Sequence, residues 1–126
     1  MILKNQRTKL LKIIKGLNKA SGLKIRSLIA KAESTVIRIL AEIALNIHKR
    51  SLGIPNYIKR GLQKFNDLLH KFGCSYGAPR NIEKNREILL KHPLSKGKGL
   101  GLFIKFLVKA SSKLLSKIVE SCLFSR

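Results

Sequence analysis

Apolar residues recur at helical spacing along most of the chain, with short polar or glycine-containing breaks between them. The clearest case is the stretch 36–47, in which Val36, Leu40, Ile43 and Ile47 share one side of a helix. Further isoleucine, leucine and alanine residues widen this stripe over much of the circumference. A helix that is apolar on so many sides is normally surrounded by other helices. The pattern therefore predicts that this stretch is the central helix of an all-α core.

A second amphipathic pattern begins at Pro55 and continues to about Phe72. Proline is well accommodated at the first position of a helix, so Pro55 predicts a helix start. Four apolar residues at intervals of three or four positions predict the buried stripe: Ile58, Leu62, Phe65 and Leu69. We therefore expect one continuous core helix over this range.

The breaks divide the chain into four parts. We expect a basic amphipathic helix or arm over residues 1–20, a helical core over 21–93, a glycine hinge over 94–101 and an amphipathic helix over 102–126. The predicted fold is all-α: a small bundle of about five to six short helices with a basic N-terminal helix and a hinged C-terminal helix.

Charge changes this picture more than any motif does. The 126 residues include 27 Lys and Arg but only 6 Asp and Glu, which gives a formal net charge of +21. An apolar fraction of 44% argues against wholesale disorder. A charge of this size opposes compaction through self-repulsion, so we expect a polyanion to accompany the folded chain. Nucleic acid, an anionic membrane surface or an acidic protein would each provide one.

Residue patterns for catalysis and metal binding are almost absent from the sequence. The acids are scattered among lysines, so no general acid–base pair is indicated. His70 and Cys74 supply only half of a zinc-binding pattern, and we expect Cys74 and Cys122 to be free thiols. The segment Gly97–Gly101 lacks the Gly-Lys-Ser/Thr of a phosphate loop. We expect no enzyme, no metal, no cofactor and no small-molecule substrate.

Nucleic acid fits the excess of cations best. Lysine and arginine replace the counterions condensed on phosphates, and every segment of the chain supplies them. Aromatic residues make up 6% of the chain and base-reading motifs are missing, so we expect non-specific binding, most naturally to double-stranded DNA. The predicted phosphate-contacting residues are Lys4, Arg7, Lys9, Lys12, Lys15, Lys59, Arg60, Lys64, Lys105, Lys109, Lys113 and Lys117.

The C-terminal helix leaves three interpretations open. Its lysines at 105, 109, 113 and 117 form a slanting basic ribbon, since each step of four residues turns about 40° past a full turn. Its apolar face comprises Phe103, Leu107, Leu114 and Ile118. Such a face packs in a core, lies on an anionic membrane, or docks on a partner such as a capsid protein. Lysine interrupts every apolar stretch and the N-terminus is charged throughout, so we expect neither a transmembrane helix nor a secretory signal.

Several features occur in an order that resembles a known family. They are Leu40-Ala-Glu-Ile-Ala-Leu-Asn-Ile47, the turn at Ile54-Pro55, the basic helix 59–69, and Asn85-Arg-Glu-Ile-Leu-Leu90 before a glycine-containing segment and an apolar tail. This arrangement resembles the small basic proteins of Polinton/Maverick-type elements and the related adintoviruses. The resemblance implies an accessory or virion protein that acts on packaged DNA, located in the virion and the host nucleus.

Overall fold

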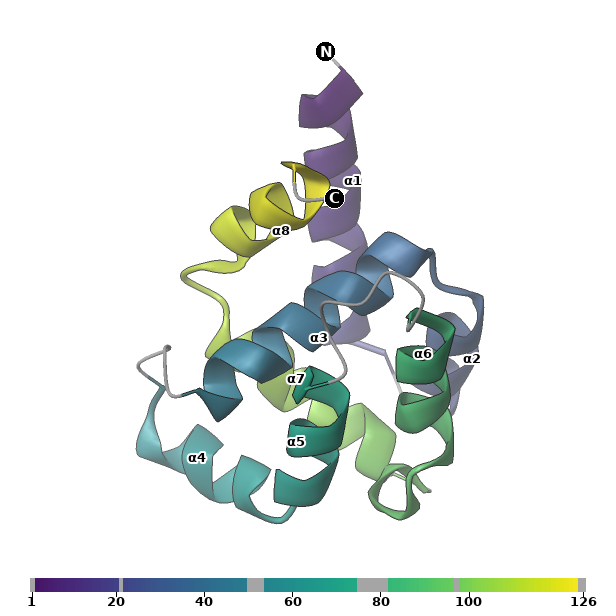
Figure 1. Cartoon of the computed structure of the whole chain (residues 1–126), viewed down its shortest axis with the longest axis vertical. Coiled ribbons are helices and arrows are strands. Elements are labelled where there is room, and N and C mark those ends of the chain that lie inside the picture. The colour runs from purple at the N-terminus through teal and green to yellow at the C-terminus, as the bar shows by residue number, and fades with distance from the viewer. Residues whose placement is uncertain (1, 21, 50–53, 75–81, 97, 125–126) are drawn as a thin grey trace.

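The computed structural model describes residues 2–20, 22–49, 54–74, 82–96 and 98–124. All regular secondary structure in these residues is helical, which confirms the all-α bundle (Figure 1). Eight α-helices and one short 3-10 helix are formed there, more than the five or six expected. They are α1 (Ile2–Leu17), α2 (Gly22–Lys31), α3 (Ser34–His48), α4 (Asn56–Gln63), α5 (Asn66–Cys74), α6 (Ile82–Lys91), η2 (Pro93–Ser95), α7 (Gly99–Ala110) and α8 (Leu115–Phe124).

Helix α3 is the central element, as its apolar pattern predicts. It crosses the middle of the molecule and contacts α1, α5, α6, α7 and α8 (Figure 1). Its buried residues are Val36, Ile37, Ile39, Leu40, Ala41, Ile43, Ala44 and Ile47. Burial on several sides of one helix follows from the wide apolar stripe, because each neighbour covers a different part of it.

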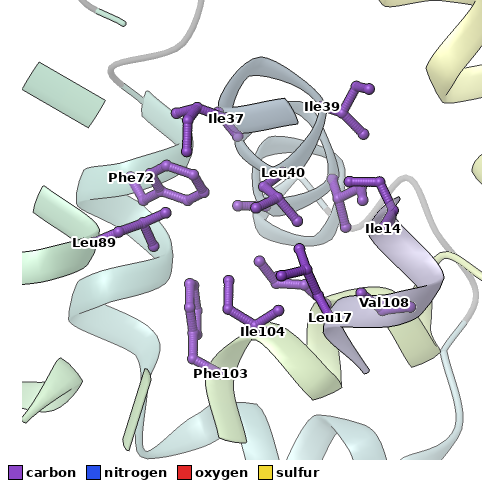
Figure 2. Close-up of a cluster of buried hydrophobic side chains, with 14 of the residues drawn as sticks. Ile14, Leu17, Ile37, Ile39, Leu40, Phe72, Leu89, Phe103, Ile104 and Val108 are labelled. Atoms are coloured by element: carbon purple, nitrogen blue, oxygen red, sulfur yellow. The ribbon is translucent and has the colours of Figure 1, made fainter. Parts of the chain in front are cut away.

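The core brings together side chains from both ends of the chain. Figure 2 shows Ile14 of α1 and Ile104 of α7 converging with Leu40 of α3. The rings of Phe65 and Phe72 lie 5.7 and 6.4 Å from the ring of Phe103, between centroids. These separations are in the range at which aromatic pairs add stability beyond simple burial. Helix α7 is therefore an integral part of the core.

Close helix packing depends on one glycine at the α3–α5 contact. A Cβ atom on Gly73 would lie 2.9 Å from the backbone nitrogen of Leu45. Backbone atoms cannot move aside as a flexible side chain can, so a larger residue would force the two helices apart. Gly73 thus brings α5, with Phe72, close against the central helix.

Two predicted helices are each broken in two. The pattern from Pro55 to Phe72 forms α4 and α5, with a turn at Lys64 and Phe65. Asn66 and Asp67 begin α5, and both residue types are poor in helix interiors but favoured near helix starts. The expected stripe survives the break, because Ile58, Leu62, Phe65 and Leu69 are all buried.

The expected C-terminal helix over 102–126 is likewise divided, into α7 and α8. The break follows Ala110, where Ser111 is buried and its hydroxyl donates to the carbonyl of Val108 at 3.2 Å. A serine that bonds to nearby backbone competes with the helical hydrogen bonds, and a second serine follows directly. The amphipathic pattern continues through this break, so it did not reveal the break.

The segment expected to be a hinge is packed where the structure describes it. Ser95 is buried in η2, and Leu100 and Gly101 are buried in the first turn of α7. A Cβ atom on Gly99 would lie 2.0 Å from the carbonyl oxygen of Leu94. Gly99 therefore permits a close backbone approach, while Gly97 lies outside the described residues.

Candidate nucleic-acid interface

The carboxylates are largely engaged within the protein. Five acids form ion pairs with described cations: Glu33 with Lys9, Asp67 with Lys71, Glu83 with Arg86, Glu87 with Lys91, and Glu120 with Arg7. The sixth acid, Glu42, also makes a polar or electrostatic interaction. These pairs use a small part of the 27 Lys and Arg. The excess of positive charge is consequently presented to solvent.

Two arginines have a structural role, so they are not counted among the cations that are free to contact a polyanion. Arg26 of α2 donates to the carbonyls of Leu90 and Ser95 at 2.7 and 2.6 Å. Arg86 of α6 donates to the carbonyls of Ile29 and Ala32 at 2.8 and 2.7 Å. Each guanidinium thus satisfies carbonyls that the end of a helix leaves without an intrahelical partner. We call these two arginines the arginine clamp.

Three lysines from two distant parts of the chain meet at one depression in the surface. The depression has a volume of about 470 Å³. It is lined by Lys15, Asn18, Lys19, Tyr57, Val108, Lys109, Ser112 and Leu115. Lys15 comes from the last turn of α1, and Asn18 and Lys19 come from the turn that follows this helix. Tyr57 comes from the start of α4 and Lys109 from the end of α7. We call this depression the basic hollow.

The net charge of the basic hollow remains positive after the helix ends are counted. Lys15 and Lys109 lie in the last turns of α1 and α7, where lysine also stabilises the negative end of a helix. Each helix end corresponds to roughly half a negative charge. Two ends therefore offset about one of the three lysine charges. All three lysines are exposed, and none forms an ion pair with a described carboxylate.

The other groups of the hollow can also contact a phosphate. Tyr57 is 63% exposed, so its hydroxyl is available to donate to a phosphate oxygen. The hydroxyl of Ser112 can donate to a phosphate oxygen. The amide oxygen of Asn18 is buried without a hydrogen-bond partner among the described residues.

The structure joins only part of the predicted phosphate-contacting set at this site. Lys15 and Lys109 line the basic hollow, whereas Arg7 and Lys9 are held in ion pairs. Lys105 is half-buried. The remaining described members are exposed outside the hollow: Lys12, Lys59, Arg60, Lys64, Lys113 and Lys117. The side chain of Lys4 lies outside the described part.

Sequence reasoning missed Lys19 and Tyr57. Lys19 follows Lys15 by four residues, just beyond the end of α1 at Leu17, and this spacing was a usable signal. Tyr57 follows Pro55 at the start of a basic helix, but nothing in the sequence indicates that it lies beside Lys109. That proximity is created by the packing of α4 against α7, where Gly61 accommodates the ring of Phe106.

The apolar face of the C-terminal segment is mainly in the core. Phe103 and Leu107 are fully buried and Ile118 is 7% exposed, whereas Leu114 is 37% exposed. Helix α7 contacts α2, α3 and α4, and α8 lies against α1 and α3. No helix in the described part of the chain has both the length and the apolar character to cross a bilayer.

Histidines occur in two polar contacts. Nε2 of His48 and Nδ1 of His70 are 3.2 Å apart, but the described residues contain no group of three or more His, Cys, Asp or Glu able to hold a metal ion. Nδ1 of His92 accepts from the backbone N–H of Leu94 at 3.0 Å, so Nε2 carries the proton and donates to Asp67 at 2.8 Å. This bond, with Lys71, lowers the pKa of Asp67 below its ordinary value of 3.8.

Comparison with known proteins adds no assignment to this geometry. No protein-family model, no curated protein sequence and no solved structure matches the chain.

Proposed function

We propose that this protein is a non-enzymatic DNA-binding and DNA-condensing protein that contacts phosphates without reading the base sequence. The observation that most supports this proposal is the basic hollow, in which three exposed lysines converge while the carboxylates are engaged elsewhere. Phosphate contacts of this kind release counterions and give strong, sequence-independent binding. The resemblance to Polinton-type proteins supports a role on the packaged genome of a virus-like element, in the virion and the host nucleus.

Binding to DNA is tested through its dependence on salt. The probe is a labelled duplex of mixed sequence, about 30 base pairs long, titrated by fluorescence anisotropy from about 50 to 200 mM salt. We expect the affinity to fall by roughly 10³-fold over this range, as for six or more phosphate contacts. A shallow salt dependence, or a strong preference for one duplex sequence, would contradict the proposal.

The role of the basic hollow is tested by removing its charge. Combined Lys15→Gln, Lys19→Gln and Lys109→Gln should reduce the slope of log K against log salt by about 2.7, since each lost phosphate contact contributes about 0.9. The matched control carries Lys49→Gln, Lys84→Gln and Lys96→Gln, three exposed lysines outside the hollow. Equal losses in both variants would mean that total charge, rather than the hollow, determines binding.

Two alternative partners are less well supported than DNA. Membrane activity through the C-terminal segment would require Phe103 and Leu107 to leave the core, at a cost of about 2 kcal/mol for each large side chain exposed. Docking of the same face on a capsid protein would require the same rearrangement. A liposome-leakage assay with and without residues 97–126 discriminates, because leakage that survives the deletion excludes this segment as the membrane-active part.

A further inference from the structure

A second depression lies beside the basic hollow but differs from it in character. It has a volume of about 560 Å³ and lies between the end of α1, α2 and the start of α3. The apolar part of its lining consists of Ile13, Leu17, Ala20, Leu28, Ala32 and Val36. Lys19, Lys24 and Lys31 also line it and are exposed, so they border it on the solvent side, and Lys19 lines the basic hollow as well. We call this depression the apolar groove.

Two observations indicate that the groove is space left for a side chain from elsewhere. A Cβ atom on Gly16 would meet nothing within 4 Å, although glycine in a helix is less stable than alanine. Leu28, which also lines the groove, is 40% exposed and is one of few large apolar side chains so exposed in the described residues. When another apolar group covers apolar surface that faces an unfilled volume, the free energy of the system decreases.

The charges at the border determine what kind of group fits. On α2, Lys24, Leu28 and Lys31 follow one another at helical spacing, so an apolar contact point has a lysine on each side. The complement is an apolar stripe with carboxylates on both sides, which is the surface of an acidic amphipathic helix. Glu33 also lines the groove, and its carboxylate is 3.5 Å from the ammonium of Lys9.

Two other occupants fit less well. A second copy of this chain would bring another net charge of +21 against the lysines, which costs free energy through like-charge repulsion. A lipid acyl chain is normally enclosed so that most of its surface is buried. The groove is instead open to solvent, which suits a helix that contributes only one face.

We propose that the apolar groove docks an acidic amphipathic helix of a partner protein, with leucine-type side chains seated between Gly16 and Leu28 and carboxylates facing Lys19, Lys24 and Lys31. This inference goes beyond DNA binding, because it gives the chain a second, protein-binding surface. Since Lys19 borders both depressions, a bound helix would place its carboxylates next to the DNA site and weaken DNA binding.

The probe is a fluorescein-labelled peptide of about 15 residues, or about four helical turns, with leucines on one face and glutamates beside them. Its control is a scrambled peptide of identical composition, which keeps the charge but loses the apolar face. Anisotropy is measured on the full chain at about 0.15 M salt, where long-range charge effects are screened. We expect the helical peptide to bind at least roughly tenfold more tightly than the scrambled one.

Variants then assign the peptide to the groove. Gly16→Leu adds a side chain at a position where a Cβ atom meets nothing within 4 Å, and Leu28→Gln removes an apolar contact. Each should weaken peptide binding on the order of tenfold. Leu102→Gln is the matched control, because Leu102 is also 40% exposed but lies outside the groove. Both groove substitutions are neutral in charge, so DNA affinity should be unchanged. This separates failure of the groove from failure of DNA binding.

Several outcomes would overturn the proposal. Equal binding of the scrambled peptide would show that charge alone drives association. Equal loss in Leu28→Gln and Leu102→Gln, or no loss in folded Gly16→Leu, would place the peptide elsewhere. Groove-dependent binding of phosphatidylglycerol vesicles without peptide binding would identify the occupant as lipid.

Discussion

The protein uses its cations in two opposite ways in two regions. At the arginine clamp, α2 and α6 lie side by side (Figure 1). Arg26 and Arg86 donate hydrogen bonds to backbone carbonyls there. In the basic hollow, Lys15, Lys19 and Lys109 remain exposed and have no described carboxylate partner. Similar formal charge therefore stabilises the fold in one region and leaves it available to a polyanion in the other.

The side-chain chemistry explains this division. The guanidinium is planar and rigid, presents several N–H donors at once and loses hydration readily, so it can bridge two carbonyls in a partly buried place. The ammonium of lysine is a strongly hydrated point charge on a flexible stem, which suits exchangeable contacts with phosphates. The comparison predicts that substitutions in the two regions affect different measurements.

The largest effect on stability is expected for Arg86→Met. The change keeps an apolar stem but removes the donors to Ile29 and Ala32, and charged hydrogen bonds of this kind contribute about 1.5–3 kcal/mol. We expect the free energy of unfolding in urea to fall by about 3 kcal/mol. The control is Lys84→Met on the exposed side of the same helix, which should change stability by less than about 0.5 kcal/mol. Similar results for the two variants would mean that the hydrogen bonds of Arg86 to the backbone do not stabilise the fold.

A smaller effect is expected when charge is kept and only the group is exchanged. Arg86→Lys retains the positive charge, but one ammonium cannot reproduce the planar fork that reaches both carbonyls, so stability should fall by about 1–2 kcal/mol. In the basic hollow, Lys15→Arg and Lys109→Arg should leave stability unchanged and DNA affinity within about twofold. If Arg86→Lys is as stable as the natural chain, the clamp works through charge alone, contrary to the comparison.

The sequence pattern predicted the buried apolar stripes but not the arginine clamp. The buried stripe of α3, and the stripe that continues from Ile58 to Leu69 across a helix break, follow from periodicity, because burial of one face is what periodicity records. The arginine clamp could not be seen in this way. Arg86 and Ile29 are 57 residues apart, so their contact depends on how α2 and α6 pack.

The sequence predicted the residues of the basic hollow only in part, for the same reason. Lys15 and Lys109 were among the predicted phosphate contacts because each lies on the basic side of an amphipathic segment. Nothing local to either segment indicates that they meet, or that Tyr57 joins them. Of the twelve predicted phosphate contacts, which are spread over the chain, two line the basic hollow. Lys19 and Tyr57, which were not predicted, line it as well.

The smallest expected effect concerns a polar contact that belongs to neither region. His92 donates through Nε2 to Asp67, and this bond links α5 to the start of η2. The hydrogen bond from His92, with that from Lys71, favours the ionised carboxylate and lowers the pKa of Asp67 below 3.8.

A group whose pKa is lower in the folded than in the unfolded chain stabilises the fold above its unfolded pKa, and that contribution disappears as the pH falls through the folded pKa. The natural chain should therefore be more stable than Asp67→Asn near neutral pH, and the two should become equally stable well below pH 3.8. Urea unfolding of both chains across this pH range measures the difference. If the difference in stability between the two chains stays constant at acid pH, the charge of the Asp67 carboxylate does not stabilise the fold, and His92 acts through packing alone.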